Sequence, residues 1–175
     1  TSVLEILVSV MGNGTITAFY EPSRPEDWQV IYINPVKGKH NDFILTPSEP
    51  EREHEIQPIS YGQKERRGNS TETPELLLGE QIKMTLYAKA TDRDVHLSIS
   101  LGYYHDGAFY SIGSSTVVIE KSNKHDVYTI TITPLTKVVP EGSKLVLVFK
   151  RTDTDPGGGT LHILCGPGKS SIELW

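Results

Sequence analysis

Apolar residues recur at every second position through most of this chain. The clearest runs are 82–86, 95–101 and 128–133, where Ile, Val, Leu and Tyr alternate with polar residues. A period of two puts successive side chains on opposite faces of a strand, so that one face is buried and the other is wet. No window of ordinary helix length carries a period of 3.6. The pattern therefore predicts an all-β protein.

Turn-forming residues separate these runs from further strand candidates. Turn signals stand at Asp106-Gly107, Pro140–Gly142 and 166–168. The further candidates are residues 15–20, 28–34, 108–119, 144–150, 160–165 and 170–174. Many short strands with regular turns are typical of a sandwich. We expect residues 1–175 to form a single antiparallel β-sandwich of jelly-roll type with about eight to ten strands.

The stretch from 46 to 79 departs from the alternating pattern. It holds four prolines, many charged residues and the segment 68–70, which reads Gly-Asn-Ser. We expect a long surface excursion there, with a short strand near 55–60. Such long connections are uncommon and are often functional.

Charge and cysteine content narrow the function. The net charge of −5 and the pI of about 5.7 argue against nucleic acid as a partner. Lys64, Arg66 and Arg67 form the one basic cluster, which Glu65 interrupts, and we interpret it as a solvated loop. No apolar run is long enough for a membrane helix. Cys165 is the one cysteine, so no intrachain disulfide forms, and we expect it to be a small buried apolar residue.

The N-terminal run, residues 2–10, is apolar on nearly both faces. Such a strand belongs in the interior of a sheet. It is either a central strand of its own sandwich or a donor strand, within residues 1–12, that inserts into a neighbouring subunit. The donor-strand residues would be Val3, Leu4, Ile6, Leu7, Val8 and Val10.

Two acidic pairs are candidates for a metal site. Asp92 and Asp94 lie between two predicted strands, and Asp153 and Asp155 precede a glycine-rich turn. Alternate carboxylates in a loop can supply oxygen ligands to Ca²⁺, so calcium is a candidate cofactor. Aspartates that bond to their own backbone in turns give the same pattern.

Two further patterns bear on glycans. Asn13 and Asn69 begin N-glycosylation sequons, and both fall in segments that we expect to be turns. Tyr103, Tyr104 and residues 109–110 flank the Asp106-Gly107 turn. These aromatic residues could form a sugar-binding platform, or they could simply pair across the strands of a hairpin, which we favour.

The sequence offers no recognisable catalytic apparatus. The six histidines have no zinc-site spacing. Residues 113–115, Gly-Ser-Ser, lack the second glycine of a nucleophile elbow and fit a bulged strand instead. We therefore do not expect an enzyme.

The segment Lys83–Arg151 nevertheless resembles a known domain. It resembles the C-terminal β-sandwich of X-Pro dipeptidyl-peptidase-type hydrolases, which is galactose-binding-like in fold. The resemblance rests on the turn residues Asp92, Asp94, Asp106, Gly107, Pro140, Gly142 and Leu145. It implies the fold and not the activity, because that family's catalytic domain has no counterpart in these residues. The apolar start and the tail, 157–175, are also similar to secreted archaeal jelly-roll surface and filament subunits.

Together these features predict an extracellular structural protein. The first expectation is a subunit of a filament or surface assembly that binds copies of itself through residues 1–12. The start at Thr1 without Met suggests cleavage of a signal or tag. The alternative is a binding module, for carbohydrate or another ligand, of a secreted protein.

Overall fold

The computed structural model describes residues 5–10, 16–36, 42–61, 65–153 and 158–175. Its regular elements are strands, apart from one short 3-10 helix, η1 (Glu26–Trp28). The all-β prediction is confirmed. No helix in these residues is long and apolar enough to cross a membrane.

The strands follow the predicted runs closely over most of the chain. Those of the first half are β1 (Glu5–Val10), β2 (Ile16–Glu21), β3 (Val30–Pro35), β4 (Phe43–Thr46), β5 (His54–Glu55), β6 (Glu65–Glu72), β7 (Leu76–Leu77) and β8 (Ile82–Ala90). Those of the second half are β9 (Val95–His105), β10 (Ala108–Ile119), β11 (Asp126–Ile132), β12 (Val138–Val139), β13 (Lys144–Arg151), β14 (Leu161–Cys165) and β15 (Ser171–Glu173).

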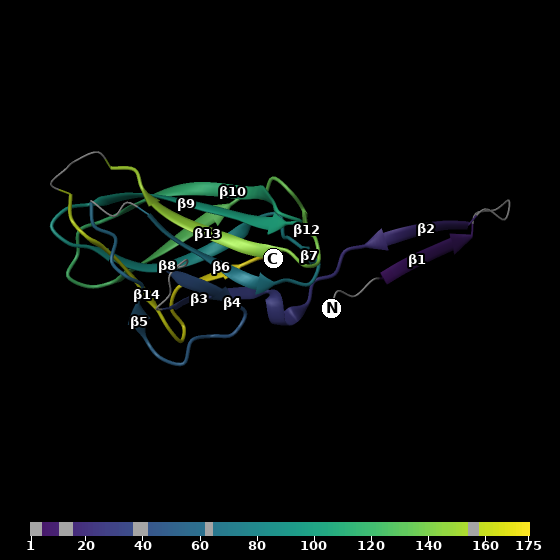
Figure 1. The fold of residues 1–175 in the computed structure, drawn as a ribbon, viewed down its shortest axis with the longest axis horizontal. Helices are drawn as coiled ribbons and strands as arrows, with labels where there is room; N and C mark the ends of the chain where they lie inside the picture. The colour runs from purple at the N-terminus through teal and green to yellow at the C-terminus, as the bar shows by residue number, and fades with distance from the viewer. Residues whose placement is uncertain (1–4, 11–15, 37–41, 62–64, 154–157) are drawn as a thin grey trace.

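Eleven strands form one continuous, folded sheet. Its order is β10-β9-β13-β6-β4-β3-β15-β8-β14-β5, with β11 paired to the other side of β8. Figure 1 shows β9, β10 and β13 on one side of the body and β3, β8 and β14 on the other. The described pairings within this sheet are antiparallel except for β4 with β6. This arrangement is the predicted sandwich, since the sheet folds over and packs against itself.

The inward positions of the long strands fill the space between the layers. Ile99, Leu147, Phe149 and Ile163 are fully buried, and each alternates with a more exposed neighbour. The predicted role of Cys165 is also confirmed, because its side chain has no exposed surface. One core thus lies between the two sides of the sheet.

Strand β6 occupies part of the stretch that we expected to be a surface excursion. It pairs with β13 on one side and with β4 on the other. Its inward positions are Arg66, Gly68 and Ser70, none of which is a large apolar residue. The excursion prediction is therefore wrong for residues 65–72, because the inner face of the strand lacks the apolar period that signals a strand.

The basic cluster is likewise not the solvated loop that we expected. The Arg66 side chain is buried, and its guanidinium donates to the carbonyl oxygens of Gln57 at 3.1 Å and Pro58 at 2.7 Å. Arg67 remains on the exposed side of the strand, whereas Lys64 lies outside the described residues. Arg66 thus connects β6 to the segment that precedes it.

The N-terminal strand is not a central strand of the main sheet. β1 pairs with β2 in an antiparallel, two-stranded sheet of their own, from Glu5 opposite Glu21 to Val10 opposite Ile16. Figure 1 shows this hairpin extending away from the body. The interpretation of residues 2–10 as an interior strand of the same sandwich is therefore wrong. Val3 and Leu4 lie outside the described residues.

A buried ion pair stabilises one end of the sandwich. Arg151, at the end of β13, donates from Nε to Asp153 Oδ1 at 3.0 Å and from Nη2 to Asp153 Oδ2 at 2.5 Å. Its Nη1 donates to the carbonyl oxygens of Ile59 and Gly159. The two side chains are only 1% and 7% exposed. One guanidinium thus connects the end of β13 to the segment before β14 and to the distant segment around Ile59.

Removing the carboxylate of this pair should destabilise the fold strongly. Asp153→Ala leaves the buried Arg151 without its counter-charge, which we expect to lower the free energy of unfolding by about 3 kcal/mol in urea melts. Glu120→Ala, which removes an exposed carboxylate, is the control. The hydrogen bonds from Arg151 also lower the pKa of Asp153. This contribution to stability is therefore complete above the unfolded pKa of about 4 and is lost as the pH falls through the folded pKa. Equal stability of the two variants would contradict the role of the pair.

Candidate functional site

The hairpin of β9 and β10 presents a group of aromatic side chains. Asp106 and Gly107 form its two-residue turn with φ values of 49° and 78°, the left-handed conformation that such turns require. Tyr103 stacks on Tyr110 with ring centroids 5.2 Å apart, and the Tyr104 and Phe109 rings meet edge to face at 5.3 Å. The predicted cross-strand pairing is therefore confirmed.

Pairing leaves three of these four rings half-exposed. Tyr104, Phe109 and Tyr110 are 43%, 52% and 48% exposed, whereas Tyr103 is 6% exposed. Burial, and to a lesser extent Tyr110, raises the pKa of Tyr103, so its hydroxyl stays neutral. Tyr104 and Phe109 lie opposite each other and share one face of the hairpin, whereas Tyr110 lies on the other face. Because aromatic side chains usually bury much of their large surface, the half-exposed pair Tyr104 and Phe109 forms a contact surface as well as a packing unit.

Gly102 sets the position of the Phe109 ring. A Cβ atom at Gly102 would lie 2.5 Å from Phe109 Cζ and 2.7 Å from the Tyr110 carbonyl oxygen. The ring therefore lies across the backbone of β9, where any side chain would displace it. A bulge between Ser111 and Gly113 of β10 follows immediately, as the sequence predicted for this strand.

The exposed aromatic pair belongs to a row that crosses four strands. Phe109 of β10 lies opposite Tyr104 of β9, Tyr104 opposite Lys144 of β13, and Lys144 opposite Glu72 of β6. Residues directly opposite each other share one face of a sheet, and three strand spacings amount to about 14 Å. We call this row, Phe109-Tyr104-Lys144-Glu72, the aromatic strip.

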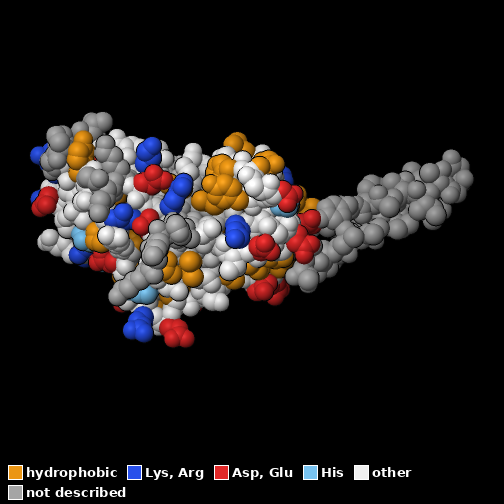
Figure 2. Space-filling model, viewed as in Figure 1, with side chains coloured by type: hydrophobic (Ala, Val, Ile, Leu, Met, Phe, Trp, Pro, Cys, Tyr) orange, Lys and Arg blue, Asp and Glu red, His pale blue; other side chains and the backbone are white. Residues whose placement is uncertain are grey.

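The aromatic strip ends at an open cavity of about 330 Å³. Residues of η1, of the turn at 140–142 and of the end of β6 line it, among them Asp27, Trp28, Glu72, Thr73 and Glu141. Figure 2 shows acidic side chains gathered at the end of the body from which the β1–β2 hairpin extends, near apolar side chains on the same face. No motif in the sequence marks these cavity residues, because they come from three separate segments.

Hydrogen bonds connect the hairpin to the wall of the cavity. His105 Nδ1 lies 3.3 Å from the hydroxyl of Ser143, which is fully buried and donates to the Pro140 carbonyl at 2.7 Å. The Ser143 carbonyl in turn accepts from the Thr73 N–H at 2.7 Å. The aromatic hairpin and the cavity therefore share one supporting network.

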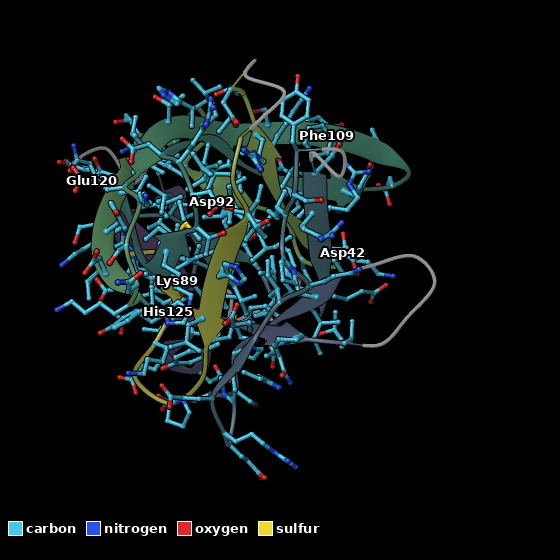
Figure 3. The ribbon with its side chains drawn as sticks, turned by 90° about the vertical axis from the view of Figure 1, so that its left-hand side faces the viewer. Asp42, Lys89, Asp92, Phe109, Glu120 and His125 are labelled. Carbon is cyan, nitrogen blue, oxygen red and sulfur yellow. The ribbon has the colours of Figure 1, made fainter. Side chains whose placement is uncertain are left out.

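Two of the four predicted calcium ligands already accept hydrogen bonds from other groups of the protein. Asp153 pairs with Arg151, and Asp94 Oδ1 accepts the Lys121 N–H at 2.7 Å. Asp92 has a φ of 70°, as in a tight turn, and Figure 3 labels it; Asp155 lies outside the described residues. The fold does bring the two loops together, since the Thr91 N–H donates to Thr160 at 3.0 Å. Within the described ranges, no group of three acidic, histidine or cysteine side chains is placed to hold a metal ion.

The calcium prediction has a direct test. An ion that binds only the folded state raises the melting temperature, and a chelator reverses that gain. Because Asp94 and Asp153 already have protein partners, we expect the melting temperature to be the same in chelator and in added Ca²⁺. A calcium-dependent rise that Asp92→Asn removes would instead establish the loop site.

The sequons differ in their surroundings. Asn69 lies in β6, between β13 and β4, and not in a turn as we expected; its position is on the partly exposed face of the strand. Asn13 lies outside the described residues. Whether either asparagine carries a glycan stays a prediction.

A second polar group lies on the outer face of β8 and β14. Glu55 Oε2 lies 2.7 Å from His162 Nδ1, and Glu55 Oε1 lies 3.6 Å from His125 Nε2. Figure 3 shows Lys89 beside His125. Burial lowers the pKa of His125, and the partly opposing charge of Glu55 does not reverse this effect, so His125 is neutral near pH 7. The group links β5 and β14 to the segment before β11.

Comparisons with known proteins inform the fold and leave the family open. No protein family matches the sequence. A search of curated proteins likewise gave no match. The folded structure, however, is similar to parts of several solved hydrolases.

These hydrolases have very different sequences. A CocE/NonD family hydrolase from Staphylococcus aureus matches 97% of this chain at 12% identity and a TM-score of 0.65. An α-amino acid ester hydrolase matches 83% at 11% identity and a TM-score of 0.63. An aminopeptidase from a marine sediment Thaumarchaeota archaeon matches 95% at 10% identity and a TM-score of 0.61.

The matches support the fold and nothing finer. The chain covers 40%, 36% and 40% of these three proteins, so it corresponds to only a part of each. The resemblance of Lys83–Arg151 to a β-sandwich of hydrolases is thereby confirmed for the fold. At such low identity the activities of these hydrolases are not assigned to this chain.

Proposed function

We propose that this chain is a non-catalytic β-sandwich module that binds carbohydrate along the aromatic strip. The observation that carries the proposal is the exposure of Tyr104 and Phe109, 43% and 52%, on a hairpin whose conformation the Asp106-Gly107 turn fixes. Aromatic rings offer rigid apolar faces to the C–H faces of sugar rings at a low entropic cost. Lys144 and Glu72 then supply a donor and acceptors for hydroxyl groups.

The dimensions of the aromatic strip suit a short oligosaccharide better than a single sugar. Its length of about 14 Å spans four strands, and its aromatic end and polar end lie on the same face. A ligand that covers the strip would stack at one end and form hydrogen bonds at the other. A glycan ligand on a cell surface would agree with the extracellular location expected from the sequence.

The chemistry of the one thiol agrees with a non-catalytic role. Cys165 is fully buried, and burial raises the pKa of its thiol to about 12. A nucleophilic cysteine needs a thiolate and access to substrate, and Cys165 has neither. The one thiol of the chain therefore takes no part in a reaction at this surface.

Removing a ring should weaken binding without unfolding the protein. We expect Tyr104→Ala and Phe109→Ala each to raise the Kd for a bound oligosaccharide about fivefold, since a stacked ring contributes on the order of 1 kcal/mol. Val127→Ala is the matched control, because Val127 is also exposed, at 56%, but lies on β11. A glycan array identifies the ligand, and calorimetry measures the affinity. Binding that the two ring variants leave unchanged, or the absence of any glycan ligand, would refute the proposal.

A second candidate function, homotypic assembly, is favoured by the hairpin of β1 and β2. Their register sets Ile6 opposite Tyr20, Val8 opposite Ala18 and Val10 opposite Ile16. An isolated two-stranded hairpin is marginal in water, and the described pairings join this one to no strand of the main sheet. The donor-strand hypothesis thus becomes a proposal that the whole hairpin, including Leu7, contacts another copy. A head-to-tail contact of this kind propagates into a filament.

Deletion of residues 1–21 separates this function from folding. We expect the truncated protein to keep its melting temperature within a few degrees, because the main sheet retains all its described pairings. The full-length chain should sediment as larger species at rising concentration, while the truncated chain remains a monomer. Val8→Asp in the full chain should act in the same way as the deletion, since burial of an unpaired charge is costly. A full-length chain that stays monomeric at every concentration would rule out assembly through the hairpin.

A further inference from the structure

Strand β10 lies at one end of the main sheet and has a paired neighbour on one side only. It pairs with β9, and no other described strand pairs with it. Its twelve residues, Ala108–Ile119, include no charged residue and no proline. Folded proteins usually protect an exposed edge strand with charges, proline or a very short length, because its free N–H and C=O groups can pair with another chain. β10 lacks these three protections.

The open part of this edge has defined limits. At one end, the carbonyl oxygen of Ile112 accepts the Leu135 N–H at 2.7 Å. At the other end, the Glu120 N–H donates to the hydroxyl of Tyr128, a residue of β11, at 2.9 Å. Between these limits, residues 113–119 keep an unbroken register with β9 and make no backbone hydrogen bond to any other described segment. We call residues 113–119 the β10 edge.

The side chains of the β10 edge suit a strand partner. Ser114, Thr116 and Val118 are exposed on one face, and they alternate with more buried residues on the other. Val117, on the inner face, packs against the core but is only partly buried. Val, Ile and Thr are the residues that strands favour, because their branched side chains pack well on a pleated surface. A strand laid along this edge would meet no charge and would cover more of Val117.

The other ends of the main sheet are better protected. β5 is only two residues long, and both of its residues, His54 and Glu55, are titratable. β11 has seven residues and begins at Asp126, directly after His125. Short length and charged residues are the usual protections of an edge. Among the ends of this sheet that the structure describes, β10 therefore offers the longest stretch without charge.

The hairpin of β1 and β2 is the complementary feature of the chain. Each of its strands has six residues, which is close to the seven residues of the β10 edge. Each strand has a single charged residue, Glu5 or Glu21, and these two lie opposite each other at one end of the hairpin. Figure 1 shows the hairpin extending away from the body that carries β10, so its outer edges are available to a second copy.

We propose that β1 of one copy pairs with the β10 edge of a second copy and extends the main sheet of that copy by one strand. This contact rests on the proposed assembly through the hairpin, and it specifies the surface that receives the hairpin. β2 continues directly into its own body, where the Ser23 carbonyl accepts the Leu77 N–H at 3.0 Å, so β1 is the less obstructed strand. Main-chain hydrogen bonds supply the affinity in such strand addition. Each copy has one donor strand and one receiving edge, so the contact is head to tail.

Matched substitutions on two edge strands identify the receiving surface. Thr116→Asp places a charge in the middle of the β10 edge, and Thr129→Asp makes the same change at an exposed position of β11 as the control. In sedimentation of the full chain, Thr116→Asp should need at least about tenfold more protein to form larger species, because a charge protects an edge from pairing. Thr129→Asp should assemble as the unmodified chain does. Ser114→Asp, at a second exposed position of the β10 edge, should act like Thr116→Asp, and melting temperatures verify folding.

A mixture of two defective chains tests the head-to-tail geometry. Val8→Asp disables the donor strand and leaves the β10 edge intact, whereas Thr116→Asp does the reverse. Each variant alone should remain a monomer, and their equimolar mixture should form dimers and nothing larger, because only one productive contact is left. Both new charges are negative, so attraction between them cannot produce the dimer. On assembly of the unmodified chain, the amides of 113–119 that point away from β9 should exchange hydrogen at least about tenfold more slowly, and those of 127–132 should not change.

These results distinguish the receiving edge from assembly itself. If Thr116→Asp assembles as the unmodified chain does, or if the mixture stays monomeric, the β10 edge is not the receiving surface, and assembly through the hairpin still stands. Loss of assembly in Thr129→Asp alone would assign the contact to β11 instead. Dimers of Thr116→Asp that Val8→Asp does not form would show hairpin pairing with hairpin, which also overturns the β10 edge. A full-length chain that is monomeric at every concentration removes the receiving edge together with the assembly.

Discussion

The contact between Phe43 and Gly68 determines how the sheet can close. A Cβ atom at Gly68 would lie 2.2 Å from the Phe43 carbonyl oxygen and 2.3 Å from a carbon of its ring. The missing side chain lets the Phe43 ring cross β6 and meet the Phe149 ring, with centroids 5.6 Å apart. Because β6 joins β4 to β13, this contact links the two halves of the sheet path. The core on either side of it depends on that close approach.

This constraint also explains where sequence reasoning failed. β10 was predicted over its full length, and the runs 82–86 and 95–101 predicted the first parts of β8 and β9, because apolar and polar residues alternate regularly there. β6 was missed because its inner face holds Arg66 and Gly68, whose roles depend on carbonyl groups and a ring from other segments. A strand whose inner face is filled by its neighbours gives no periodic signal of its own.

For the N-terminal run, residues 2–10, the sequence predicted the strand but not its pairing partner. Its apolar pattern correctly predicted a strand, and the pattern alone did not reveal the partner. The run from Ile16 to Glu21 is similar in character, and a short connection allows the two to pair locally. Local pairing needs little loop closure, so these two strands pair with each other and not with the main sheet. The period of a sequence pattern indicates whether a segment is a strand or a helix. It does not indicate which other strand the segment pairs with.

The same distinction applies to the candidate site, where local features were predictable from the sequence and long-range features were not. The Asp106-Gly107 turn and the aromatic pairs were predictable, because turn chemistry and cross-strand pairing are local properties of one hairpin. The cavity was not, since Asp27, Glu72 and Glu141 meet only after the sheet has folded over. No spacing in the sequence relates these three acids, and each by itself is typical of an exposed loop.

A chain of hydrogen bonds connects the aromatic hairpin of β9 and β10 to the wall of the cavity. His105 leads from the hairpin turn to Ser143, and Ser143 leads through its carbonyl to Thr73 in the cavity wall. Ser143 is fully buried and uses both its hydroxyl and its carbonyl, so it cannot turn away without leaving polar groups unpaired. The aromatic rings and the carboxylates are thus held at a fixed separation before any ligand arrives. Such preorganisation lowers the entropic cost of binding, and it rewards a ligand whose apolar face and polar group have the same separation.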